Sequence, residues 1–485
     1  MTKTRCASDR LKMACQTALC GGRSRLGRFH REEDGVFIAF SMFIMVIILM
    51  VAGIGVDTMR FEMERTRLQN TVDRAVLAAA DLDQTLAPKA VVEDYFVKAG
   101  ITDVVPVVDP KTGVGYKSVN ATVQKTLNTQ FMRMSGVDEL TIPAAATAEE
   151  RIPKVEISLV VDISGSMNDN NRLPNLREAA KTFVGAVLRP ETAGRVSLNF
   201  IPYSEHVNVG PEIMGLLNVN QVHNYSHCIE FDESDFASAA LNKTKLYQQM
   251  QHFQWNTYSI ESGYSQNTRF DTLCPRNSYE RVTVMSQSNS ALISQINALK
   301  PRAGTQIQIG MKWAVAMLDP SFQSINAALS ASNVNKSDPA FSARPAAYSD
   351  AKTLKTIVLM TDGENSDSTR INGSVYATSS HYAHWNNFNF NYYLQNYVYS
   401  WQRPSWYYTK YYNSLGNNLL NQICTAAKNN GIVIWTVGFE VTDTGDTVMR
   451  NCASSPAHFF DVNGVEITAA FQSIARQINQ LKLTQ

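Results

Sequence analysis

The sequence has almost no net charge and lacks the common catalytic motifs. Its 485 residues hold 44 Lys and Arg against 43 Asp and Glu, and charged residues make up only 18%. Nucleic acids and acidic polymers select basic proteins, so this balance gives no support to either partner. A nucleophile elbow, an H-E-x-x-H zinc motif and a phosphate-binding loop are also missing. The length of 485 residues suggests two or three domains. Because these motifs are missing, we expect no enzyme activity.

Charge is absent altogether from residues 35–56. As a helix these residues span about 33 Å, which matches the thickness of a bilayer core. A buried helix or a cleaved signal peptide are the alternatives, but a signal core has only about 7–15 residues and no clear A-x-A site follows. Residues 1–34 carry eight Lys and Arg and form a basic tail. We expect a single-pass anchor in a bacterial inner membrane, with a cytoplasmic N-terminus and a periplasmic or cell-surface C-terminal domain.

Glycine and proline are missing from residues 57–81, so the anchor helix is predicted to continue outside the membrane. An apolar stripe at helical spacing supports this, at Leu68, Val72, Ala75, Val76 and Ala79. The rest of residues 57–153 predicts a small α/β stem with a helix at 90–98. Its strands are expected at 103–108, 116–127 and 141–150.

The segment 154–167 reads as a buried strand that ends in polar residues. A near-continuous apolar run stops at Asp162, and Ser164 and Ser166 follow on alternate positions around Gly165. A carboxylate with two hydroxyls suits a hard divalent cation such as Mg²⁺, Mn²⁺ or Ca²⁺. Because Ser and Asp are also common helix N-caps, this turn alone is ambiguous.

Two later segments offer further oxygen ligands. Thr305 stands in a Gly-flanked loop before a predicted helix, and Asp362 ends a second apolar strand and precedes Gly363. Since the carboxyl ends of parallel strands meet at one edge of a sheet, we expect both residues near Asp162.

These residues resemble the metal-ion-dependent adhesion site (MIDAS) of von Willebrand factor type A domains. The resemblance implies that Asp162, Ser164, Ser166 and Thr305 ligate the cation directly or through water, and that Asp362 acts chiefly through water. It also implies a doubly wound parallel sheet over residues 154–485, and a protein partner that offers an Asp or Glu to the metal. Strands are expected at 154–162, 195–203, 206–210, 355–360, 432–439 and 458–462. Helices are expected at 173–188, 289–299, 306–318, 413–430, 446–455 and 465–483.

The anchor and its continuation resemble TadE/TadG-like proteins of the tight-adherence (Flp) pilus system. The resemblance is carried by residues 35–82, which hold the apolar run, Leu68-Gln69, Asp73, Ala75 and an Ala-rich end. Pilin-type peptidase sites in that system have Glu at the fifth residue after Gly. In this chain the fifth residue after Gly35 is Phe40, so the site is not matched. We therefore expect an unprocessed, pilin-like rod and other pilus components as partners.

The cysteines divide at the anchor. Three precede it, and Cys228, Cys274, Cys424 and Cys452 follow it. An oxidising compartment beyond the membrane would allow the later four to pair. We expect Cys228–Cys274 to hold an insertion at 211–286, and Cys424–Cys452 to join elements that flank one strand; buried thiols are the alternative.

Two further insertions are expected, a surface loop at 322–352 and an aromatic segment at 366–412 that leaves from the Asp362 loop. Its aromatic residues either contact a partner beside the metal or form the core of the insertion. Candidate partner contacts are Tyr376, Trp385, Tyr392, Tyr393, Trp401 and Trp406. The sequence thus favours a membrane-anchored, metal-dependent adhesion or assembly component of a tight-adherence pilus. The alternative is an envelope scaffold for pilus assembly in which the metal only stabilises the domain.

Overall fold

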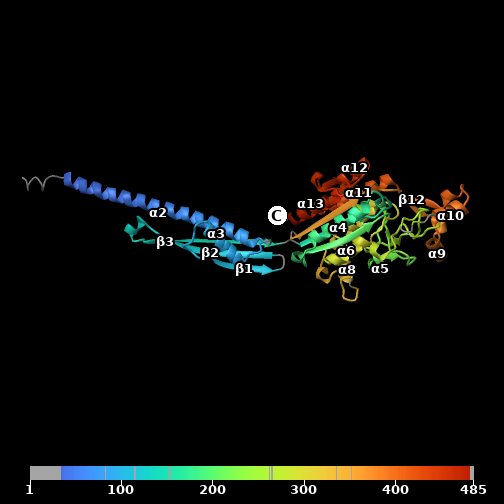
Figure 1. Ribbon diagram of the computed structural model, residues 1–485, viewed down its shortest axis with the longest axis horizontal. Helices are drawn as coiled ribbons and strands as arrows, with labels where there is room; N and C mark the ends of the chain where they lie inside the picture. The colour runs from blue at the N-terminus through green and yellow to red at the C-terminus, as the bar shows by residue number, and fades with distance from the viewer. Residues whose placement is uncertain are drawn as a thin grey trace, which may run out of the picture. The chain divides into compact units, whose positions relative to one another are not determined.

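The computed structural model describes residues 34–81, 84–113, 116–151, 154–260, 263, 266–334, 336–350 and 352–480. The chain divides into two compact units, Met1–Arg151 and Ile152–Gln485. Figure 1 shows the elements of both. Apart from Asp34, the basic tail expected at 1–34 lies outside the described residues.

The first unit is one long helix packed on a small sheet. Helix α2 (Asp34–Ala80) runs without interruption through the apolar segment and beyond it. Its apolar stripe from Leu68 to Ala79 is buried, as the spacing predicts. The stripe packs with helix α3 (Pro88–Lys98) against an antiparallel sheet. The strands are β1 (Val107–Gly113), β2 (Tyr116–Asn128) and β3 (Glu139–Arg151), in the order β1-β2-β3.

The first strand of this sheet begins later than expected. Residues 103–106 precede β1, and Asp103 instead forms an ion pair with Lys125 of β2 (3.1 Å). A polar side chain at the edge of a sheet can be held by an ion pair, so its segment need not pair as a strand. The alternation of apolar residues alone does not reveal this.

The second unit is built on a six-stranded sheet with the order β14-β13-β10-β4-β5-β9. Neighbouring strands pair in parallel except β9, which is antiparallel to β5 at the edge. Their bounds are β4 Lys154–Asp162, β5 Val196–Tyr203, β9 Thr283–Ser286, β10 Thr353–Thr361, β13 Val433–Phe439 and β14 Phe459–Val462.

Helices cover both faces of this sheet. One face packs against α4 (Arg172–Val187), α6 (Asn289–Ala298) and α13 (Glu466–Gln480). The other packs against α7 (Ile307–Ala316), α11 (Asn413–Asn429) and α12 (Asp443–Cys452). Side chains of the central strand β4 point alternately into these two cores, and all but Lys154 are buried. A strand buried on both faces explains the near-continuous apolar run in its sequence.

Two of the expected elements of this unit are wrong. Residues 206–210 form no strand beyond one isolated bridge at Asn208, because their backbone groups bond to separate distant segments. The Asn208 carbonyl accepts the Val282 N–H (2.9 Å), and the Val209 N–H donates to the His227 carbonyl (3.0 Å). The edge position beside β5 belongs to β9, much later in the chain, so the last residues of the insertion expected at 211–286 belong to the main sheet. The expected surface loop at 322–352 contains helix α8 (Gln323–Leu329), which buries apolar residues.

The insertions at 211–286 and 366–412 contain small elements of their own. Helix α5 (Gly210–Gly215) is followed by a sheet of β6 (Val219–Asn220), β8 (Tyr247–Gln249) and β7 (Ile229–Glu230). The aromatic segment forms β11 (Ser368–Ile371), α9 (Ser379–Asn387), α10 (Phe390–Tyr397) and β12 (Tyr407–Tyr411). Residues of both insertions share one apolar cluster, in which Phe253 packs on Phe390. The two insertions therefore share one core, while other residues of 211–286, such as Phe231 and Phe236, pack in the core of the main sheet.

Candidate metal centre

Four of the five predicted metal ligands converge at the carboxyl ends of β4 and β10. Asp162 Oδ1 accepts the backbone N–H of Ser164 (2.7 Å), and the hydroxyls of Ser164 and Ser166 lie 3.0 Å apart. Ser166 Oγ donates to Asp362 Oδ1 (2.8 Å). These contacts join positions 196 residues apart, as expected for the ends of adjacent parallel strands.

Thr305 lies in a loop that adjoins the same turn. The backbone N–H of Gly165 donates to the Ala303 carbonyl (3.1 Å), and the N–H of Arg302 donates to the Ile163 carbonyl (2.8 Å). Thr305 itself is tied to the loop after Asp362, since its N–H donates to Ser366 Oγ (2.9 Å). The Thr305 loop is therefore held between the two carboxylate-bearing loops.

Three residues that the sequence did not single out contact the two carboxylates. Thr361 Oγ1 (2.8 Å) and the Tyr203 hydroxyl (3.3 Å) both donate to Asp162 Oδ2. Arg172 donates to Asp362 Oδ2 (3.0 Å) and also to Glu440 (2.9 Å). Thr361 and Tyr203 end the strands on either side of β4, a signal that could have found them. Arg172 starts a helix, and the pattern around it gives no such signal.

The two carboxylates are strongly desolvated. Asp162 is fully buried and Asp362 nearly so. Burial raises the pKa of both groups, and the charge of Asp362 raises that of Asp162 further. Arg172 counters part of this at Asp362, although it also pairs with Glu440.

The donor set fits a hard cation. It offers carboxylate and hydroxyl oxygens, each with lone pairs left after the hydrogen bonds described. Among the described residues, no three His, Cys, Asp or Glu side chains cluster as a metal site. A cation at this place would therefore depend on the hydroxyls of Ser164, Ser166 and Thr305.

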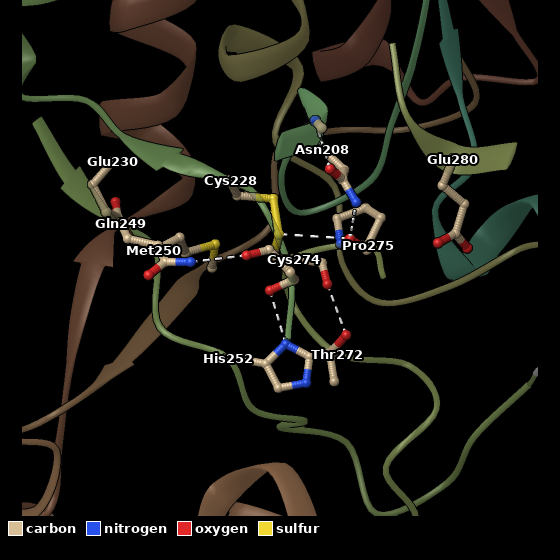
Figure 2. The surroundings of a disulfide bond; sticks show 12 residues. Asn208, Cys228, Glu230, Gln249, Met250, His252, Thr272, Cys274, Pro275 and Glu280 are labelled. Carbon is tan, nitrogen blue, oxygen red and sulfur yellow. Dashed lines mark hydrogen bonds between the residues drawn. A yellow bond between two sulfur atoms is a disulfide. The ribbon is translucent and has the colours of Figure 1, made fainter. Parts of the chain in front are cut away.

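Both expected disulfides are present. Cys228–Cys274 closes 46 residues of the first insertion, and Cys424–Cys452 links α11 to the end of α12. Figure 2 shows the first bond, with the Met250 N–H donating to the Cys228 carbonyl (2.9 Å) and Thr272 Oγ1 donating to the Cys274 carbonyl (2.7 Å). Cys228 and Cys274 lie in the cluster shared by the two insertions.

The predicted partner contacts divide by burial. Tyr376 and Trp385 are core residues, with Trp385 only 3% exposed, so the expectation that they present a contact surface is wrong. Their rings pack on Tyr382 and Phe390, because the insertion must build its own core.

The other four predicted contacts are more accessible. Tyr392 is half-buried, and Tyr393 and Trp406 are partly buried against the same core. Trp401 is 76% exposed. It therefore offers the largest free aromatic surface of the six.

A known family matches part of the first unit. Residues 35–82 match the family model described as "Putative Flp pilus-assembly TadE/G-like". This segment is TadE/G-like. The match confirms the resemblance seen in its sequence and relates the chain to Flp pilus assembly. Within the described residues, the helix of the TadE/G-like segment is the one long and apolar enough to cross a membrane, with a mean hydropathy of 2.8 in its window. It fits a single-pass anchor.

Solved structures similar to the chain include three pilus proteins. The vWF domain of the type V pili tip protein Mfa5 from Porphyromonas gingivalis is 16% identical, with a TM-score of 0.36 and coverage of 69% of this chain and 98% of that chain. The pilus adhesin SpaC from Lactobacillus rhamnosus GG is 15% identical, with a TM-score of 0.33 and coverage of 78% of this chain and 35% of that chain. The pilus adhesin RrgA from Streptococcus pneumoniae is 11% identical, with a TM-score of 0.33 and coverage of 78% of this chain and 49% of that chain. Such distant similarities establish no function, and no curated protein matches the chain.

Proposed function

We propose that the chain is a membrane-anchored component of a tight-adherence pilus system that binds a protein partner through a divalent cation. The convergence of Asp162, Ser164, Ser166 and Asp362 carries this proposal. The second unit then acts as a von Willebrand factor A-like domain with a doubly wound parallel sheet. The TadE/G-like segment supports the pilus context.

The anchor and the disulfides support an exported second unit. Helix α2 contains an uncharged run that suits a bilayer core. Disulfides persist in oxidising compartments, and the second unit holds two of them. The proposed orientation therefore leaves the basic tail in the cytoplasm.

The chain's own residues define what a cation would do at this site. Asp162, Ser164, Ser166, Thr305 and Asp362 would hold Mg²⁺, which when bound would offer a position to a carboxylate of the partner. Thr361 and Tyr203 orient Asp162 by donating to its second oxygen. Arg172 restrains Asp362 from the opposite side.

A structural scaffold is the second candidate. Burial of Tyr376 and Trp385 favours it, because aromatic residues expected to contact a partner instead stabilise the insertion. In this alternative the cation only stabilises the loops around Asp162 and Asp362. Pilus components would then bind elsewhere on the chain, whether or not the cation is present.

The test measures cation binding and partner binding on the same protein. The full chain in lipid nanodiscs is titrated calorimetrically with MgCl₂, and then used to capture proteins from an envelope extract with and without EDTA. Asp162→Ala removes a predicted ligand. Asp169→Ala, an exposed carboxylate on the same turn, is the matched control.

The proposal expects Mg²⁺ binding and cation-dependent capture by the wild type and by Asp169→Ala, and neither by Asp162→Ala. Binding of Mg²⁺ with capture unaffected by EDTA would support the scaffold instead. A wild-type chain that binds no divalent cation would refute the metal-dependent mechanism.

A further inference from the structure

The loop between β2 and β3 is fastened to the middle of helix α2. Asp57 of α2 is buried, and its carboxylate accepts the backbone N–H groups of Gln130 (3.1 Å), Phe131 (2.7 Å) and Met132 (2.8 Å). Three donors on one carboxylate fix the hairpin loop, residues 129–138, at this level of the helix. Figure 1 shows β2 and β3 running beside the C-terminal half of α2, while the N-terminal half continues past the hairpin.

A second contact lies one helical turn toward the N-terminus. A Cβ atom on Gly53 would come within 2.5 Å of the Phe131 Cβ and 2.6 Å of its Cγ, so the phenyl group lies directly on the helix backbone. Any larger residue at position 53 would displace it. Gly53 thus lets the tip of the hairpin pack closely on α2 at this contact.

The contact between Gly53 and Phe131 lies inside the uncharged run. Residues 35–56 carry no charge, and Asp57 is the first ionisable residue after them. Gly53 is therefore about 5 Å inside the apolar end of the run, at a rise of 1.5 Å per residue. A helix that crosses a bilayer with this run places Phe131 near the edge of the hydrocarbon core.

The same loop presents apolar side chains outward. Phe131 is 40% exposed, Met134 65% and Val137 37%. They are flanked by an exposed ion pair between Arg133 and Asp138 (3.1 Å). Such a mixture of apolar side chains with a cationic group suits the interface between lipid headgroups and acyl chains.

We propose that the β2–β3 loop inserts Phe131, Met134 and Val137 into the phospholipid surface from which α2 emerges. This inference rests on the membrane anchoring in the proposed function. The apolar surface of the loop is continuous with that of α2 at Gly53, and this continuity favours lipid over a protein cover. Asp57 satisfies three N–H groups that would otherwise lack water at this depth.

Site-directed spin labelling tests the inference on the full chain. Cys6, Cys15 and Cys20 are replaced by Ser, so that a single new cysteine carries the nitroxide. Met134→Cys reports on the loop, Leu49→Cys on the anchor, and Lys111→Cys on a distant part of the sheet. Lys111 pairs with Ser118, next to Lys117, which donates to the Asp81 carbonyl. Asp81 directly follows α2 and lies about 36 Å from Asp57 along the helix axis.

Collision rates with oxygen and with a water-soluble nickel chelate are measured in vesicles of phosphatidylethanolamine and phosphatidylglycerol. The Met134 label should show a ratio of oxygen to nickel collisions several-fold above that of the Lys111 label. Asp57→Ala should lower this ratio by releasing the loop. Glu62→Ala, an exposed carboxylate on the same helix, should leave it unchanged.

The other outcomes overturn the inference in distinguishable ways. A Met134 label as open to nickel as the Lys111 label, with the Leu49 label in lipid, rejects the inserted loop but keeps the anchor. Shielding of the Met134 label from both reagents identifies a protein cover in place of lipid. A Leu49 label open to nickel removes the anchor and the inserted loop together.

Discussion

Replacing Asp162 by Asn should stabilise the protein when divalent cations are removed. Burial, together with the charge of Asp362, raises the pKa of Asp162 from 3.8 to about 7. A folded-state pKa above the unfolded value means that the folded state binds the proton more tightly. Stability is then lost as the pH rises through the interval between the two values.

The magnitude follows from the same values. Each pKa unit corresponds to about 1.4 kcal/mol, so an ionised Asp162 lowers the free energy of unfolding by about 4 kcal/mol at pH 7. Asn keeps one oxygen for the Ser164 N–H, but its amide must rearrange the Thr361 and Tyr203 hydroxyls. Allowing about 1 kcal/mol for each of these hydrogen bonds leaves a gain of about 2–4 kcal/mol.

Thermal unfolding of the second unit, followed in EDTA at pH 7 and at pH 4, measures this effect. Asp162→Asn should raise Tm by about 4–8 °C at pH 7, and the difference should shrink toward pH 4, where the wild-type carboxyl is protonated. Mg²⁺ should then raise Tm of the wild type but not of Asp162→Asn. Asp169→Asn serves as the exposed control. A variant less stable than the wild type at both pH values in EDTA would refute this reasoning.

Three further sets of substitutions test other parts of the structure. Changing both Cys228 and Cys274 to Ala should cost about 4 kcal/mol, from the entropy of a 46-residue loop; limited proteolysis should then cut the two insertions first, and cleavage elsewhere first would contradict this. Trp385→Ala should lower the free energy of unfolding by about 3–5 kcal/mol and Trp401→Ala by under about 0.5 kcal/mol, because only Trp385 is buried; denaturant unfolding compares them, and equal losses would contradict the burial argument. Arg172→Gln should lower Tm in EDTA and enlarge the rise produced by Mg²⁺, because Asp362 loses its cationic neighbour; a variant with unchanged Tm in EDTA would show that this ion pair contributes nothing.

Sequence reasoning succeeded where one physical constraint governs a long segment. The run before Asp162 is mostly apolar because β4 is buried on both faces, and this placed the strand end and its polar turn. The stripe on α2 and the pairing of Cys228 with Cys274 followed in the same way from helical spacing and from a poorly cored insertion.

Sequence reasoning failed where the outcome depends on which distant segment arrives as a neighbour. The strand beside β5 is β9, and the residues at 206–210 gave no sign that another segment would take this edge. Arg172 reaches Asp362 only because α4 starts beside the end of β10. Burial of Trp385 likewise depends on Phe390 and Tyr393 packing around it, which composition alone does not distinguish from an exposed aromatic surface.

The apolar cluster that joins residues 211–286 to residues 366–412 makes these insertions interdependent. Excising the later segment would leave Phe253 and the Cys228–Cys274 bond without their cover, so a truncated chain would fail for reasons unrelated to recognition. Transferring these insertions to another scaffold would require both segments at once, with the spacing that α6, α7, α8 and β10 give them here.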